Sequence, residues 1–101
     1  MRGQIYTIED IMAVIIPVAR EYGVKQMTLF GSYARGDATA KSDIDFHLID
    51  TVDLWGYVKL CGFRQELEDR LGVGVDVLTS GAMDNDVLEM VRRDEVLIFE
   101  Q

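Results

Sequence analysis

Two short motifs contain the residue types of this sequence that are best suited to chemistry. Gly31 and Ser32 stand between an apolar segment and a short helical stretch, where free backbone N–H groups can bind a phosphate. Asp43 and Asp45 are two residues apart in a segment with the pattern of a strand, so both carboxylates lie on one face. One cation can bridge such neighbours. Together the two motifs indicate nucleotide chemistry on metal ions.

A third carboxylate, Asp76, lies among the valines of a later short strand and has no local reason to be there. Each of these residues also has a purely structural interpretation. Asp43 and Asp45 are typical of edge-strand charges that discourage aggregation, and Asp76 alone reads as a solvent-facing residue. Gly31 suits a tight turn and Ser32 a helix cap. The chemical interpretation rests on their combination.

Hydrophobic periodicity predicts an α/β (α+β) fold in which two or more helices cover one small mixed β-sheet. Thr7 is expected to cap the first helix, Gly23 to end it, and Pro17 to kink it or start a new turn. A second long helix is predicted from Leu54 to Leu71, and Asp84 is expected to cap a last one. The apolar stripe of the second helix comprises Tyr57, Leu60, Phe63, Leu67 and Leu71. The predicted strands are 24–30, 43–50, 73–77 and 96–99.

In the segment from Asp43 to Asp50, apolar residues alternate with polar ones. The polar face, with Asp45, is where chemistry is expected. His47 lies on that same predicted face. A single histidine on a strand is more often a packed or surface residue than a metal ligand, so we leave His47 out of the predicted site.

Composition limits the remaining possibilities. The chain has 101 residues, which suits a single domain over residues 1–101. Its net charge of −8 repels a nucleic-acid backbone, so direct nucleic-acid binding is not expected. The lone Cys61 forms no internal disulfide, and no apolar stretch is long enough for a signal sequence or a membrane span. We therefore expect a soluble, cytoplasmic protein that does not engage membranes.

Three motifs in a fixed order resemble the minimal nucleotidyltransferases of the DNA polymerase β superfamily. They are Gly31-Ser32-Tyr33-Ala34-Arg35-Gly36, Ser42-Asp43-Ile44-Asp45 and Val75-Asp76-Val77. The resemblance covers nearly the whole chain. It implies a nucleotidyltransferase-type domain that uses two Mg²⁺ ions and ATP in an in-line displacement.

The resemblance also implies roles for the carboxylates. Asp43 and Asp45 would hold both metal ions. Asp76 would complete the site for the ion that activates the acceptor hydroxyl, and would accept the proton of that hydroxyl. All three are thus predicted to be metal ligands and catalytic residues.

Four further residues are predicted to bind the substrate. Gly31 and Ser32 would hold the β- and γ-phosphates. Arg35 would either reach a phosphate or pair with a nearby acid and fix the turn. Ser42 stands beside the carboxylates, where it would also cap or orient their strand.

Minimal members of this superfamily usually occur with a helical HEPN-domain partner, as the antitoxin of a toxin–antitoxin pair. Some transfer AMP from ATP to a tyrosine hydroxyl of that ribonuclease toxin, and we expect the same here, within a hetero-oligomer. The acidic surface suits a partner with a basic, RNA-binding face. Two alternatives stay open: a non-catalytic nucleotide-binding antitoxin that acts by complex formation, and an adenylyltransferase for small molecules of the aminoglycoside type.

Overall fold

The computed structural model describes residues 5–49 and 56–101. The predicted end of the second strand at Asp50 and the start of the following helix at Leu54 lie outside these ranges. The helices are α1 (Ile8–Tyr22), α2 (Ser32–Arg35), α3 (Gly56–Leu71) and α4 (Asn85–Asp94), with a 3₁₀ turn, η2 (Ser80–Ala82). The strands are β1 (Gln26–Phe30), β2 (Ile44–Ile49), β3 (Val75–Thr79) and β4 (Val96–Glu100).

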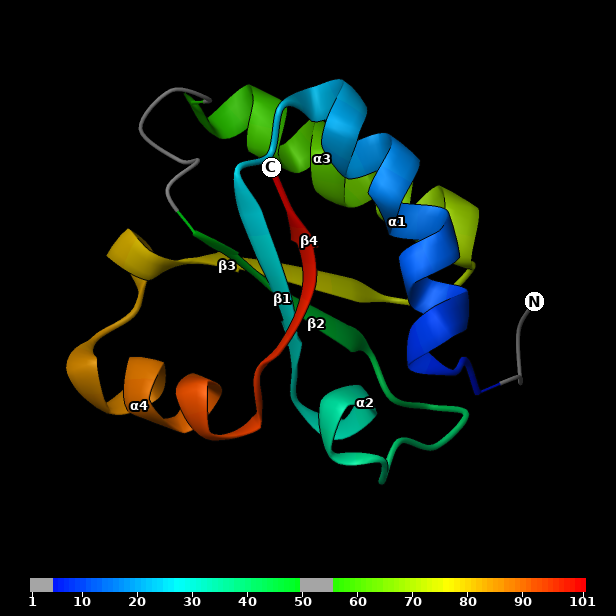
Figure 1. Ribbon diagram of the computed structural model, residues 1–101, viewed down its shortest axis with the longest axis vertical. Coiled ribbons are helices and arrows are strands. Elements are labelled where there is room, and N and C mark those ends of the chain that lie inside the picture. Colours follow the sequence, from blue (N-terminus) through cyan, green and yellow to red (C-terminus); the bar gives the residue numbers. More distant parts are fainter. Residues whose placement is uncertain (1–4, 50–55) are drawn as a thin grey trace.

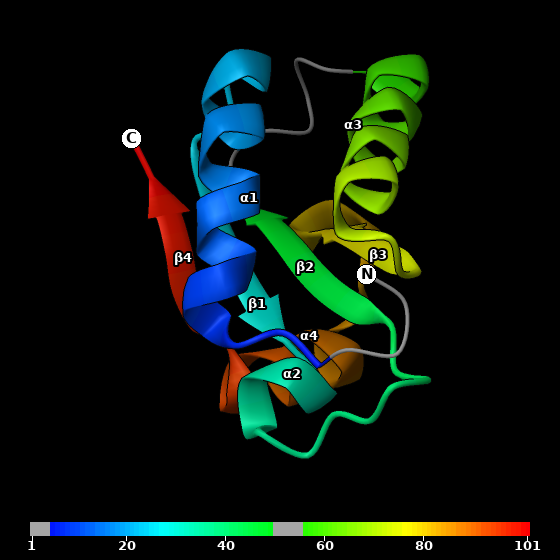
Figure 2. The same ribbon diagram turned by 90° about the vertical axis from the view of Figure 1, so that its right-hand side faces the viewer.

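The four strands form one mixed sheet in the order β3-β2-β1-β4. β1 is antiparallel to β2 and β4, whereas β2 and β3 are parallel. Helices α1 and α3 lie side by side over one face, and α4 lies on the other side of the sheet (Figures 1 and 2). This arrangement confirms the predicted mixed sheet covered by helices.

Helix α1 begins and ends as the sequence predicts. Thr7 and Asp10 form a reciprocal capping box at its start, and Gly23 ends it in the left-handed conformation. Pro17 lies inside α1, which continues through it from Ile8 to Tyr22 without ending. Of the two predicted effects of this proline, the start of a new turn is therefore wrong, and the kink stays a prediction.

The core lies between the sheet and the pair α1 and α3. The apolar residues of β2 are fully buried on that face, as their alternation predicts: Ile44, Phe46 and Leu48. In α3 the stripe holds for Phe63, Leu67 and Leu71, which are also fully buried. Tyr57 is 79% exposed, so the prediction that the stripe begins there is wrong. The first turn of α3 extends beyond the sheet that would cover it (Figure 2).

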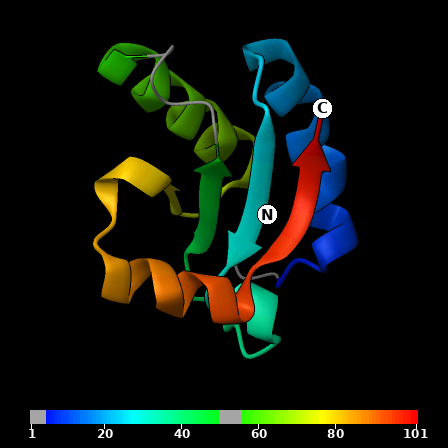
Figure 3. The same ribbon diagram turned by 60° about the vertical axis from the view of Figure 1, so that its left-hand side comes forward.

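Helix α4 begins where the sequence predicts, because the side chain of Asp84 accepts a hydrogen bond from the backbone N–H of Val87. It crosses the ends of the strands at the same end of the molecule as α2 (Figure 3). Among the described helices, none is both long and apolar enough to cross a membrane.

Candidate active site

The central feature of the site is a pair of carboxylates on neighbouring strands. Asp45 of β2 and Asp76 of β3 are direct partners in the parallel register, so their side chains leave the same face of the sheet. Asp43 immediately precedes β2, and its charge also acts on Asp45. The structure thus brings the three predicted carboxylates to one end of the strand pair.

Two glycines allow backbone to approach these carboxylates closely. A Cβ at position 31 would overlap Oδ2 of Asp45, and a Cβ at position 74 would overlap Oδ1 of Asp43. Gly31 also has a φ of +76°, a backbone angle that residues with a side chain rarely adopt. Asp45 therefore lies against the turn after β1, and Asp43 against the turn before β3. The sequence gives no indication of the role of Gly74, because its neighbour Asp43 is distant along the chain.

Burial and charge both disfavour ionisation of Asp45. Partial burial raises its pKa to about 6, and the neighbouring charge and hydrogen bond of Asp76 add to the shift. The charge of Asp43 acts in the same direction, whereas that of Arg35 lowers the pKa. The site therefore carries an excess of negative charge that a bound cation would relieve.

The turn between β1 and α2 places Gly31 and Ser32, which are predicted to bind phosphate, at the start of a short helix. Gly31 occupies the N-cap position of α2, and no side chain caps the helix there. The backbone carbonyl of Gly31 accepts hydrogen bonds from the N–H groups of Ala34 and Arg35, so the first turn of α2 begins at Ser32. Backbone N–H groups in this position favour a phosphate oxygen.

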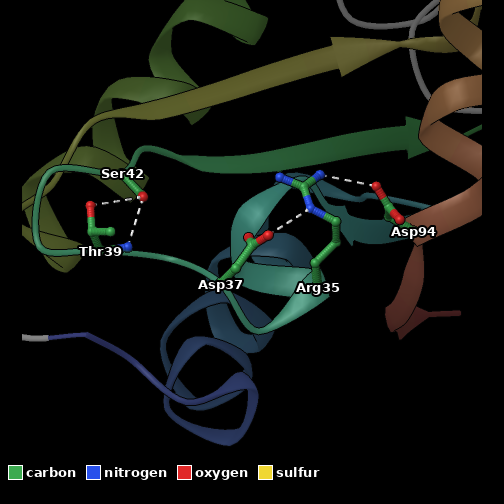
Figure 4. Close-up of polar contacts among 5 residues, drawn as sticks. All are labelled: Arg35, Asp37, Thr39, Ser42 and Asp94. Carbon is green, nitrogen blue, oxygen red and sulfur yellow. Dashed lines mark hydrogen bonds and ion pairs between the residues drawn. The ribbon is translucent and has the colours of Figure 1, made fainter.

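Arg35 lies at the end of α2 and pairs with two acids (Figure 4). Its Nε is 3.3 Å from Oδ2 of Asp37, and its Nη1 is 3.1 Å from Oδ2 of Asp94 at the end of α4. The side chain remains 46% exposed. These two bonds leave further guanidinium N–H groups for another acceptor. Of the two predicted roles, pairing with nearby acids is the one that the structure contains.

Ser42 organises the loop before the carboxylates. Its Oγ accepts a hydrogen bond of 2.9 Å from the backbone N–H of Thr39 and lies 3.4 Å from Thr39 Oγ1 (Figure 4). The hydroxyl is thus used to shape the turn that leads into Asp43.

The donor set fits Mg²⁺ that is bound together with a substrate. Over residues 5–49 and 56–101, no three His, Cys, Asp or Glu side chains converge closely enough to hold an ion by themselves. Mg²⁺ in proteins is commonly held by one or two carboxylates, with substrate phosphates and water completing its shell. The pair Asp45 and Asp76, with Asp43 beside it, matches that pattern next to the turn at Gly31.

His47, which we left out of the predicted site, is buried on the same face of β2 as Asp45. It is 2% exposed, and both ring nitrogens have partners. Nδ1 is 3.0 Å from Oε1 of Glu95, and Nε2 is 2.7 Å from Oγ of Ser80. Thr28 donates to the same oxygen of Glu95 at 2.9 Å. A histidine on the polar face of β2 was the one signal for this cluster, and its partners lie far away in the sequence.

A known family matches most of the chain. Residues 12–98 match the model described as "Nucleotidyltransferase domain". MJ0128 of Methanocaldococcus jannaschii, whose name provisionally assigns it to the protein adenylyltransferases, is 34% identical over 91 residues, which are 89% of this chain and 92% of the relative. The protein adenylyltransferase MntA of Thermococcus cleftensis is 29% identical over 96 residues, with 91% and 96% of the two chains covered.

Solved toxin–antitoxin complexes contain chains of the same fold. In a complex crystallised with AMP-PNP, one chain superposes with a TM-score of 0.77 at 22% identity, covering 89% of this chain and 73% of that one. In a complex between the tri-AMPylated HEPN toxin of Shewanella oneidensis and an MNT antitoxin, the TM-score is 0.73 at 18% identity, covering 94% and 74%. At these identities the likeness concerns the fold.

Proposed function

This chain belongs to the nucleotidyltransferase family, and we propose that it transfers AMP from ATP to a hydroxyl of a protein partner in a Mg²⁺-dependent reaction. Its relatives named as protein adenylyltransferases support the reaction class. The observation that carries the proposal is the pairing of Asp45 with Asp76 beside the turn at Gly31. This arrangement combines carboxylate oxygens, which can bind a cation, with the backbone N–H groups of the turn, which can bind phosphates.

The two glycines suggest a direction for the reaction. Gly31 lies against Asp45, so pyrophosphate bound at this turn leaves on the β1 side. In an in-line displacement the acceptor oxygen approaches from the opposite side. That side of the carboxylates is the one with Asp43 and Gly74, where a shallow pocket also includes Lys41. The acceptor hydroxyl is therefore expected to enter between the loop before β2 and the turn before β3.

Each carboxylate has a distinct task in this scheme. When bound, Mg²⁺ supplies positive charge that offsets the triphosphate and the developing charge on the entering and leaving oxygens. Asp43 and Asp45 would hold the cations, and Asp76 would complete the set of carboxylate ligands. Asp76 is exposed on the acceptor side, where its carboxylate accepts the proton that the attacking hydroxyl releases. The oxygen of that hydroxyl then bonds to the α-phosphorus as the bond to pyrophosphate breaks.

The proposed acceptor is a tyrosine of a HEPN-domain ribonuclease toxin, which makes this chain an antitoxin. The structural relative from S. oneidensis is an MNT antitoxin bound to a tri-AMPylated HEPN toxin, which supports this partner. The net charge of −8 favours a partner with a basic face. We place the reaction in the cytoplasm because it consumes ATP.

One labelling experiment separates the candidate functions. The protein is incubated with ATP labelled at the α-phosphate, Mg²⁺ and the HEPN-domain protein proposed as its partner, and a parallel sample contains kanamycin instead. We expect label on the HEPN protein, none with EDTA, and loss of its ribonuclease activity. Loss of ribonuclease activity without label would favour neutralisation by binding, and label on kanamycin would favour a small-molecule enzyme. Either result contradicts the proposal.

A further inference from the structure

A buried polar cluster joins four separate elements on the face of the sheet that carries Asp45. Its members are Thr28 of β1, His47 of β2, Ser80 of η2 and Glu95 between α4 and β4. Among the described residues, no buried side-chain polar atom is left without a hydrogen-bond partner, so the cluster is internally satisfied. It is therefore a rigid connection rather than a strained one.

Glu95 is the centre of this cluster. One carboxylate oxygen, Oε1, accepts from Thr28 Oγ1 and lies 3.0 Å from His47 Nδ1, while the side chain is 16% exposed. Because a carboxylate only accepts, Nδ1 of His47 carries the proton of this bond. These contacts fix Glu95, which lies between the end of α4 and the start of β4.

The residue next to Glu95 contacts the short helix that follows the turn at Gly31. Asp94, the last residue of α4, holds Arg35 at the end of α2 through the 3.1 Å contact with Nη1. Figure 4 shows the guanidinium lying between Asp94 and Asp37, which come from different elements. The charge of Arg35 acts on Asp45. A continuous chain of contacts thus leads from His47 and Glu95, through Asp94, to the guanidinium group of Arg35 beside the site.

We infer that Glu95 and His47 are positioning residues for the triphosphate. By anchoring the α4–β4 junction they hold Asp94, and Asp94 places the Arg35 guanidinium beside the turn at Gly31. The inference rests on the proposed function, because it assigns Arg35 to the phosphates of the substrate. Arg35 on its own has a flexible, half-exposed side chain, and a fixed anion partner reduces the entropy lost when it binds a phosphate.

A binding cycle in the intact protein tests this. The dissociation constant of AMP-PNP with Mg²⁺ is measured for the wild type, Glu95→Ala, Arg35→Ala and the double variant. We expect Glu95→Ala to weaken binding about tenfold, within the range for residues that share one network. In the Arg35→Ala background it should have no further effect. The conservative Glu95→Gln, which keeps an acceptor for Thr28 and His47, should bind like the wild type. Glu100→Ala, at the exposed C-terminal end of β4, is the matched control.

A second measurement does not depend on nucleotide binding. The NMR signals of the Arg35 Nη–H groups report the bond of Nη1 to Asp94, and they should shift in Glu95→Ala and in His47→Phe but not in Glu100→Ala. If Glu95→Ala does not fold, His47→Phe keeps the ring volume and provides the same comparison. An unchanged Arg35 signal, or equal weakening with and without Arg35, would overturn the inference. If the wild type failed to bind AMP-PNP while the Arg35 signal still shifted, the proposed function alone would be at fault.

Discussion

Asp45 and Asp76 face each other across the parallel pairing of β2 and β3, so their carboxyl groups lie on the same face of the sheet. Burial of Asp45 and the charge of Asp76 both oppose ionisation, which raises the pKa of Asp45 to about 6. At neutral pH the pair holds like charges at close range, which lowers the free energy of unfolding. The same repulsion favours binding of a cation.

Replacement of Asp45 by Asn should stabilise the cation-free protein at pH 7. We expect a gain of about 1 kcal/mol in the free energy of unfolding, since solvent screens this partly exposed carboxyl and reduces the effect of the full shift. Urea unfolding in the presence of EDTA measures it. Glu100→Gln, on the exposed side of β4, should change stability by less than about 0.5 kcal/mol. Equal values for the two variants would show that the pair is not repulsive.

The pH dependence of stability should have a defined sign. Because the folded-state pKa of Asp45 is raised, the folded protein binds this proton more tightly than the unfolded chain. The stabilisation that the folded protein gains by binding this proton is therefore fully present below about pH 4, and it is lost as the pH rises to about 6. The stability of Asp45→Asn relative to the wild type should increase across that window and then level off. A constant difference from pH 4 to pH 7 would contradict the raised pKa.

Nucleotide binding with Mg²⁺ should depend on the same proton. At pH 7.5, AMP-PNP and Mg²⁺ at about 100 times the dissociation constant should add about 2.7 kcal/mol to the free energy of unfolding. The gain should shrink below pH 6, because protonation of Asp45 competes with the cation. Thermal unfolding with AMP-PNP and either Mg²⁺ or EDTA measures this. The same gain at pH 5 and pH 7.5, or with EDTA, would argue against a carboxylate-bound ion.

Two glycines on either side of α2 provide a matched comparison. Gly31 and Gly36 both have positive φ, but only a Cβ at position 31 meets another residue, namely Asp45. Gly36→Ala should cost about 1 kcal/mol from backbone strain alone. Gly31→Ala should cost more and should also weaken AMP-PNP binding, because it displaces Asp45. Chemical unfolding and calorimetry measure both effects. If Gly36→Ala weakened nucleotide binding equally, the close approach at Gly31 would not be responsible.

Local sequence patterns predicted much of the fold and of the carboxylate geometry. Thr7 and Gly23 bound α1 through contacts within one helical turn, and the alternation around Phe46 marks the buried face of β2. Asp43 and Asp45 were found from the same alternation, whereas the role of Asp76 was predicted only from its combination with them and from the family resemblance. Two features depend on contacts between distant residues and were not predictable: the bond between Arg35 and Asp94, 59 residues apart, and that between His47 and Glu95, 48 residues apart.

The most direct test of the central claim is AMP transfer by Asp43→Asn and Asp45→Asn at saturating Mg²⁺, with labelled ATP and the HEPN partner. Each variant keeps the side-chain volume but replaces a charged carboxylate with a neutral amide, so we expect transfer to fall by about 10²-fold or more while the protein stays folded. Asp86→Asn, an exposed aspartate of α4, serves as the control and should keep full transfer. Transfer near the wild-type rate in either site variant would contradict the account.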